Sequence, residues 1–115
     1  MPVAIKRIYE PSSSQDGYRI LVDRLWPRGV KKESANIDRW LNAIAPSNEL
    51  RTWFGHEPAK WTEFQKKYKL ELKDNPAWNE LVQLAKQFNK LTLLYAAKDE
   101  LHNHAVMLAK LLNKY

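Results

Sequence analysis

The hydrophobic pattern of the chain predicts three buried strands and a helical middle. Continuous apolar runs occupy residues 3–8, 18–22 and 91–96, and short runs of this kind are typical of strands that are covered on both faces. Residues 34–88 instead repeat their apolar positions at helical spacing. We therefore expect an α/β protein with a long helical excursion between the second and the last strand.

Five segments show the helical spacing. Ser47 and Asn75 are typical N-cap residues, and Pro58 suits the first turn of a helix. Pro46 ends the predicted helix that precedes it in the chain. The predicted stripes are Ile37, Trp40, Leu41 and Ile44; Leu50, Trp53 and Phe54; Trp61, Phe64, Tyr68 and Leu72; Trp78, Leu81, Val82, Ala85 and Phe88; and, after Lys98 and Asp99, Leu101, Ala105, Leu108 and Leu112. These stripes predict helices that cover the sheet and place four of the five tryptophans in the core.

A small, mostly parallel sheet covered by helices accommodates all these elements in one α/β domain, residues 1–115. The polar loop at residues 10–17 is short for a parallel crossover, which usually needs a dozen or more residues. The direction of the first strand relative to the second therefore stays open, whereas the last strand fits a parallel arrangement.

The composition narrows the classes of function. The 115 residues include no cysteine, which excludes disulfides, thiol nucleophiles, iron–sulfur clusters and cysteine zinc sites. No stretch approaches the roughly 18 apolar residues of a membrane span, so we expect a cytoplasmic protein without a membrane partner. The net charge of +6, from 19 Lys and Arg against 13 Asp and Glu, indicates anionic partners. We expect no cofactor, and the oligomeric state stays open.

Polar residues follow the predicted strands, at the positions where open α/β sheets bind their ligands. Asp23, Arg24, Trp26 and Arg28 follow the second strand, and Lys98 follows the last one. Guanidinium groups suit bidentate contact with phosphate or carboxylate, so the two arginines predict an anion clamp, with Lys98 adding charge and Trp26 forming a wall. The alternative is an internal Asp23–Arg24 ion pair, with Arg28 on the solvated surface.

Two of the three histidines are candidates for proton transfer, because the ordinary pKa of histidine lies near neutral pH. His102 and His104 lie near the start of the last predicted helix, and they would move the proton while Asp23 orients an arginine. Two residues apart, they point to different sides of a helix, so we assign no metal site. Asp99 either caps the helix or orients His102. His56 is expected in a loop, and a site role would require that loop to fold over the strand ends.

The preferred function is therefore binding of an anionic, phosphate-bearing small molecule at the carboxyl edge of the sheet, with or without a reaction. The alternative is a nucleic-acid or protein-interaction module that uses a lysine-rich helical face. That face contains Lys66, Lys67, Lys69 and Lys73. Acidic residues interrupt it and no nucleic-acid-binding motif accompanies it, which keeps nucleic acid as the second choice.

Several runs of the chain resemble the YeaO-like proteins, a bacterial and archaeal family of unknown function. The runs lie at residues 4–9, 16–29, 45–47, 53–56 and 94–99, and the most specific is VDRLWPRG at residues 22–29. More distant relatives have an acidic residue and an arginine after the second strand and a Cys-His-Arg pattern after the last one. The resemblance implies matching roles for Asp23, Arg24 and His104, but no thiol or cysteine-metal chemistry.

Overall fold

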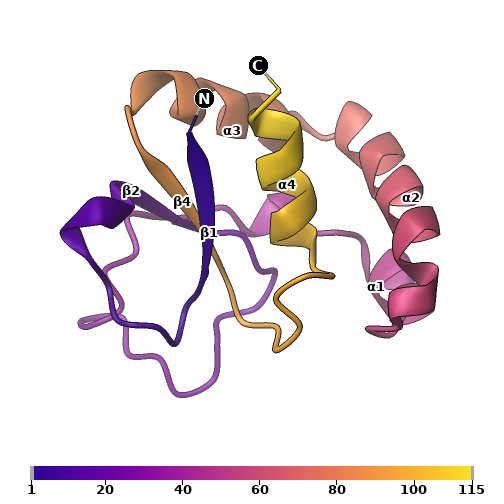
Figure 1. The fold of residues 1–115 in the computed structure, drawn as a ribbon, viewed down its shortest axis with the longest axis horizontal. Coiled ribbons are helices and arrows are strands. Elements are labelled where there is room, and N and C mark those ends of the chain that lie inside the picture. Colours follow the sequence, from indigo (N-terminus) through magenta and orange to yellow (C-terminus); the bar gives the residue numbers. More distant parts are fainter. Residues whose placement is uncertain (1, 115) are drawn as a thin grey trace.

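The sheet consists of four parallel strands in the order β1–β4–β2–β3, of which Figure 1 labels β1, β4 and β2. The strands are β1 (Val3–Arg7), β2 (Tyr18–Leu21), β3 (Arg39–Trp40) and β4 (Leu91–Tyr95). The computed structural model describes residues 2–114. The last strand, β4, lies in the centre and pairs with β1 at Ile5↔Leu93 and with β2 at Ile20↔Leu93. The prediction of a parallel sheet is confirmed, and the first strand is parallel to the second although the two are not neighbours.

The helices follow the strands in the predicted order, with α1 (Asn48–Phe54), α2 (Trp61–Lys73) and α3 (Pro76–Gln87) in the long excursion and α4 (His104–Leu112) at the end. Short 3₁₀ turns occupy Ser14–Asp16, Asn42–Ile44 and Pro58–Lys60. Two predicted caps are confirmed, since Ser47 accepts from the Leu50 N–H and Asn75 accepts from the Ala77 N–H. Within residues 2–114, no helix combines the length and the apolar character needed to cross a membrane.

The two faces of the sheet are covered differently. Ile20 and Leu93, completely buried, point toward one core cluster that contains residues of all four α-helices. Leu21 and Leu94 point to the opposite face, where Trp26, from the loop after β2, packs beside them. Figure 1 shows α4 next to the sheet, with α1 and α2 beyond it. The helices thus cover one face, and an irregular loop covers the other.

The predicted helix through residues 37–44 is wrong. This segment is extended at β3 and pairs with β2, where the Leu41 N–H donates to the Leu21 carbonyl. Ile37 then packs on the loop-covered face, whereas Leu41 belongs to the helix-covered core. Trp40 is 37% exposed instead of buried. The backbone hydrogen bonds offered by the edge of β2 outweigh the helical spacing of these apolar residues.

The last helix begins later than predicted, at His104. Its N-cap is Asn103, whose side chain accepts from the Val106 N–H. Leu101 therefore lies outside the helix and is 73% exposed, so its predicted place in the apolar stripe is wrong. The physical reason is the turn before the helix, in which the Asp99 carboxylate accepts from the Leu101 and His102 N–H groups.

Candidate functional site

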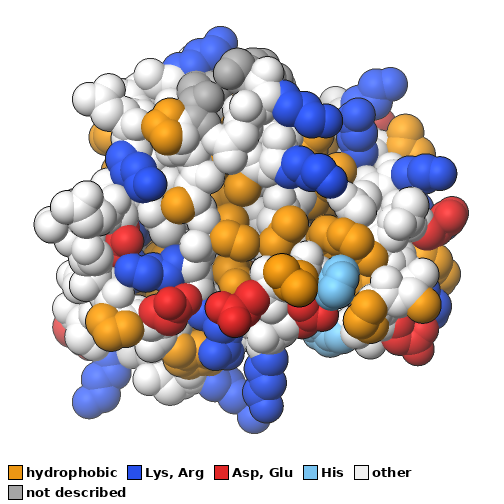
Figure 2. Space-filling model, viewed as in Figure 1, with side chains coloured by type: hydrophobic (Ala, Val, Ile, Leu, Met, Phe, Trp, Pro, Cys, Tyr) orange, Lys and Arg blue, Asp and Glu red, His pale blue; other side chains and the backbone are white. Residues whose placement is uncertain are grey.

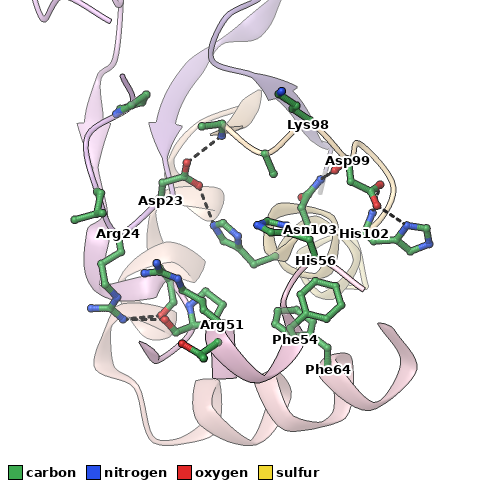
Figure 3. Close-up of a pocket in the computed structure, with 18 of the residues that line it drawn as sticks. Asp23, Arg24, Arg51, Phe54, His56, Phe64, Lys98, Asp99, His102 and Asn103 are labelled. Carbon is green, nitrogen blue, oxygen red and sulfur yellow. Dashed lines mark hydrogen bonds and ion pairs between the residues drawn. The ribbon is translucent and has the colours of Figure 1, made fainter. Parts of the chain in front are cut away.

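A cavity of about 770 Å³ lies at the carboxyl edge of the sheet, between the strand ends and α1 (Figure 3). Three segments that are far apart in the sequence contribute most of its walls: the loop after β2, the region from Ala45 to His56, and the turn after β4. In Figure 2, histidine side chains appear among hydrophobic ones near this lower edge of the molecule. The predicted location of the site therefore coincides with a cavity that can enclose a small molecule.

Asp23 and His104 connect the end of β2 to the start of α4. The His104 Nε2 donates to the Val22 carbonyl at 2.9 Å and lies 3.2 Å from Asp23 Oδ1. The other carboxylate oxygen of Asp23 accepts from the Ala96 N–H at 2.9 Å. Asp23 therefore orients a histidine and not an arginine, and the Nε2 of His104 is already engaged by the protein.

Arg24 lines the cavity and also supports its wall. One terminal nitrogen donates to the carbonyls of Ala45 and Pro46, at 3.0 and 3.1 Å. Its Nε is buried and has no protein partner, alone among the buried side-chain nitrogens and oxygens of the described residues. The alternative Asp23–Arg24 ion pair does not form, because the guanidinium points toward the loop before α1 (Figure 3).

Arg28 is not among the residues that line this cavity, whereas Trp26 is. The Arg28 carbonyl accepts from the Tyr9 hydroxyl, and its side chain is exposed. The Trp26 Nε1 donates to the Val30 carbonyl at 2.7 Å, which closes the loop after β2 into a turn. This turn separates the two arginines, so the structure does not bring the predicted pair together at the cavity.

The turn after β4 contributes Lys98, Asp99 and His102 to the cavity. The His102 Nδ1 donates to Asp99 Oδ2 at 2.9 Å. The backbone N–H of Leu101 and the imidazole of His102 together lower the pKa of Asp99 below its ordinary value. Of the two predicted roles of Asp99, the orientation of His102 is present. The other role is met only in part, because the Asp99 carboxylate accepts from backbone N–H groups in the turn and not as the cap of the helix.

Sequence reasoning missed the contribution of α1 and the turn that follows it. Arg51, Thr52, Phe54 and His56 all line the cavity. The chain turns after α1 through Gly55 and His56, both with left-handed backbone angles. The loop of His56 therefore does reach the strand ends. The only local signal was the Gly55-His56 break itself, since the spacing of α1 does not reveal where the helix lies on the sheet.

The loop that precedes α1 is held from two sides. Arg24 binds its carbonyls, and Glu71 of α2 accepts from both the backbone N–H and the hydroxyl of Ser47, at 2.9 and 2.5 Å. Ser47 in turn caps α1. These contacts position the helix so that Arg51 lies at the same cavity as Arg24.

Metal binding has little support in the described part of the chain. Asp99 and His102 form a pair, but no group of three or more histidine, aspartate and glutamate side chains is arranged to hold a metal ion. The groups that line the site are instead cationic side chains, imidazoles that contact protein acceptors, and apolar walls.

The lysine-rich face that forms the alternative site lies on α2. Lys66, Lys67, Lys69 and Lys73 are exposed, and Lys67 lies over the Trp53 ring at 5.0 Å. None of these four lysines lines the cavity. The two sites are therefore separate and can be tested independently.

Comparison with known proteins places the whole chain in one family. A protein of Escherichia coli (strain K12) with the name uncharacterized protein YeaO is 46% identical over 110 residues, 95% of each chain. An uncharacterized protein of Mycobacterium tuberculosis (strain ATCC 25618 / H37Rv) is 40% identical over 96% of this chain and 93% of its own length. No solved structure shows significant similarity. Residues 2–115 match the family model described as the inactive DUF488-N3 subclade, and the chain belongs to this family.

Proposed function

We propose that this protein binds a small anionic, phosphate-bearing molecule in the cavity at the carboxyl edge of its sheet, without converting it. The observation that supports the proposal is that three cationic side chains from three separate segments, Arg24, Arg51 and Lys98, line one cavity. The two carboxylates of the cavity, Asp23 and Asp99, are already engaged by histidines and backbone N–H groups. The cations are thus left with charge to offer a ligand.

Two of these cations, Arg51 and Lys98, keep most of their side-chain donors free of partners among residues 2–114. Among residues 2–114, the Arg51 guanidinium donates only to Asn48, at a long 3.4 Å, and the exposed side chain of Lys98 lines the cavity without a bond to an acidic group. A buried donor without an acceptor, such as the Arg24 Nε, costs about 1–3 kcal/mol. A phosphate has several acceptor oxygens and can satisfy donors from more than one arginine.

Binding without turnover is supported by the state of the two histidines that follow the last strand. The Nε2 of His104 and the Nδ1 of His102 are both committed to protein acceptors, and the chain has no cysteine to act as a nucleophile. The description of the subclade as inactive supports the same conclusion. In this proposal Asp23, His102 and His104 hold the site in shape, and the protein acts in the cytoplasm.

The proposal is tested by isothermal titration calorimetry with inorganic phosphate at low ionic strength. The variant Arg51→Gln removes a charge without changing the core, since Arg51 is exposed and outside every hydrophobic cluster. Loss of a hydrogen bond to a charged group costs roughly 1.5–3 kcal/mol, so we expect phosphate binding to weaken by about 10-fold or more. The matched control is Lys66→Gln on α2, which should bind phosphate like the wild type.

Two outcomes would contradict the proposal: no saturable phosphate binding by the wild type, or equal affinity in Arg51→Gln. The nucleic-acid alternative is examined with a DNA duplex and the triple variant K66Q/K67Q/K69Q. If that variant lowers duplex affinity and flattens its salt dependence while Arg51→Gln does neither, the lysine-rich face is the functional one.

A further inference from the structure

We infer that the ligand of this cavity carries an aromatic ring next to its anionic group, as in a phosphate ester of an aromatic or heteroaromatic compound. The inference rests on the proposed function and specifies the class of ligand. It comes from the apolar walls of the cavity, which an inorganic anion would leave empty, and from polar side chains there that make no hydrogen bond to residues 2–114.

The size of the cavity exceeds the need of a simple anion. Inorganic phosphate has the bulk of a few water molecules, each of about 30 Å³ in the liquid. The cavity volume of about 770 Å³ is many times larger and lies in the range of about 300–1,000 Å³ that is usual for organic ligands. The natural ligand therefore has a substantial part in addition to its anionic group.

The additional part is expected to be apolar and flat. Trp26, Pro46, Phe54 and Phe64 line the cavity together with the cationic residues. Figure 3 shows Arg24 on one side of the cavity, and Phe54 and Phe64 on another. A ligand that fills both regions must present an anionic end to the first and an apolar end to the second.

The aromatic wall is rigid and includes an exposed ring. Phe54 and Phe64 stack with ring centroids 4.4 Å apart and are almost completely buried, so they keep their positions. His56 lies beside Phe54, with ring centroids 6.3 Å apart and tilted planes, and its side chain is exposed at the cavity. An incoming ring can therefore contact the exposed His56 imidazole next to Phe54, and contact between aromatic rings is favourable.

Two polar groups on the same wall can contact the edge of such a ring. The Thr52 hydroxyl and the His56 imidazole line the cavity, and neither takes part in any of the side-chain hydrogen bonds that organise the rest of the site. A heteroaromatic ring has nitrogen or oxygen atoms at its edge, whereas an aliphatic chain has none. These groups thus favour a ring over a flexible tail.

The test compares ligands that differ only in the ring. Phenyl phosphate and methyl phosphate form one pair, and benzoate and acetate form the other, with calorimetric titration as the measurement. We expect phenyl phosphate to bind at least about 10-fold more tightly than methyl phosphate, because stacking on an aromatic side chain commonly has this magnitude. A larger gain in the phosphate pair than in the carboxylate pair identifies a phosphate ester as the ligand class.

The variant His56→Asn removes the exposed ring and keeps the backbone intact, since asparagine tolerates the left-handed angle of φ 57° at this position. We expect it to reduce the advantage of phenyl phosphate to about threefold or less, with no change for methyl phosphate. The control Tyr9→Asn removes an exposed ring that does not line the cavity and should preserve the full advantage.

The outcomes separate this inference from the proposed function. One outcome is that methyl phosphate binds, that Arg51→Gln weakens this binding, and that phenyl phosphate binds no more tightly. In that case the inference of an aromatic ring is wrong, and the proposal of anion binding is supported. If neither phosphate ester binds, both proposals are wrong. An unchanged advantage in His56→Asn would also overturn the assigned contact.

Discussion

A buried ion cluster at Asp16 gives the sharpest prediction for stability. The Asp16 carboxylate accepts from Arg19 at 2.5 Å, from Lys6 at 3.0 Å and from the Ser13 N–H at 2.9 Å. The side chains of Asp16 and Arg19 are only 9% and 6% exposed. Burial by itself would raise the pKa of Asp16, but the hydrogen bonds from Lys6, Ser13 and Arg19 lower it below its ordinary value.

The substitution Asp16→Asn leaves the buried Arg19 and the half-buried Lys6 without their counter-ion. Removal of one partner of a buried ion pair costs about 3–5 kcal/mol, a large part of the total of roughly 5–15 kcal/mol that stabilises a domain. At roughly 4 °C per kcal/mol for a chain of this size, we expect the melting temperature to fall by about 10–20 °C. Urea denaturation followed by circular dichroism measures the free energy of unfolding directly.

The same cluster predicts a pH dependence. The pKa of Asp16 is lower in the folded than in the unfolded state. Its contribution to the free energy of unfolding is therefore complete above the pKa of the unfolded state, about 3.9, and is lost as the pH falls through the pKa of the folded state. Asp16→Asn should therefore flatten the loss of stability below about pH 4. The exposed Asp74→Asn serves as the control and should stay within about 0.5 kcal/mol of wild type. A cost below 1 kcal/mol for Asp16→Asn, or an unchanged acid profile, would refute the reasoning.

Two further substitutions test the packing of the fold. Gly17 has φ 68°, and a Cβ there would lie 2.3 Å from the Lys90 carbonyl oxygen, so Gly17→Ala should destabilise by more than about 2 kcal/mol in urea denaturation; a cost below 0.5 kcal/mol would contradict the close approach. The buried Tyr68 hydroxyl donates to the Ile44 carbonyl at 2.6 Å, so Tyr68→Phe should cost about 1–1.5 kcal/mol at pH 7. Burial raises the pKa of Tyr68 well above its ordinary value. Above about pH 10 the unfolded chain therefore loses the Tyr68 proton more readily than the folded protein, and the stability of the wild type falls. This fall should be shallower in Tyr68→Phe when the free energy of unfolding is measured against pH.

The predictions from sequence were most accurate where short-range chemistry decides the structure. The caps at Ser47 and Asn75 each need only a side chain and the N–H groups two or three residues later. The central strand β4 also follows from its own composition, because a short continuous apolar run is typical of a strand covered on both faces. In the structure its five residues are all buried.

The errors occurred where a partner distant in sequence competes with the local pattern. Residues 37–44 have helical spacing, yet the free edge of β2 draws Arg39 and Trp40 into a fourth strand. Leu101 has the correct spacing for α4, yet the turn built by Asp99 delays the helix until His104. In both segments, hydrogen bonds that the sequence pattern does not display determine the backbone.

In the candidate site too, some features follow from the sequence and others depend on contacts between distant residues. Its position at the carboxyl edge, and the presence there of Asp23, Arg24 and Lys98, follow from the sequence, because parallel strands bring their following residues to one edge. Whether His102 and His104 face this edge was open from the sequence, and the structure places both at the cavity. The partners of these residues do not follow from the sequence. Asp23 engages His104, and Arg24 engages the loop before α1.

The amino-acid sequence by itself determines the strands at the centre of the sheet, most of the helices and the edge at which a ligand would bind. Only the tertiary structure decides that Arg51 and not Arg28 lines the cavity with Arg24, and that His56 reaches it. The reason is physical: hydrophobic periodicity specifies which face of an element is buried, but the position of α1 depends on Arg24 and Glu71 contacts that join segments more than 20 residues apart. The excess positive charge of the chain thus becomes a specific site only after folding.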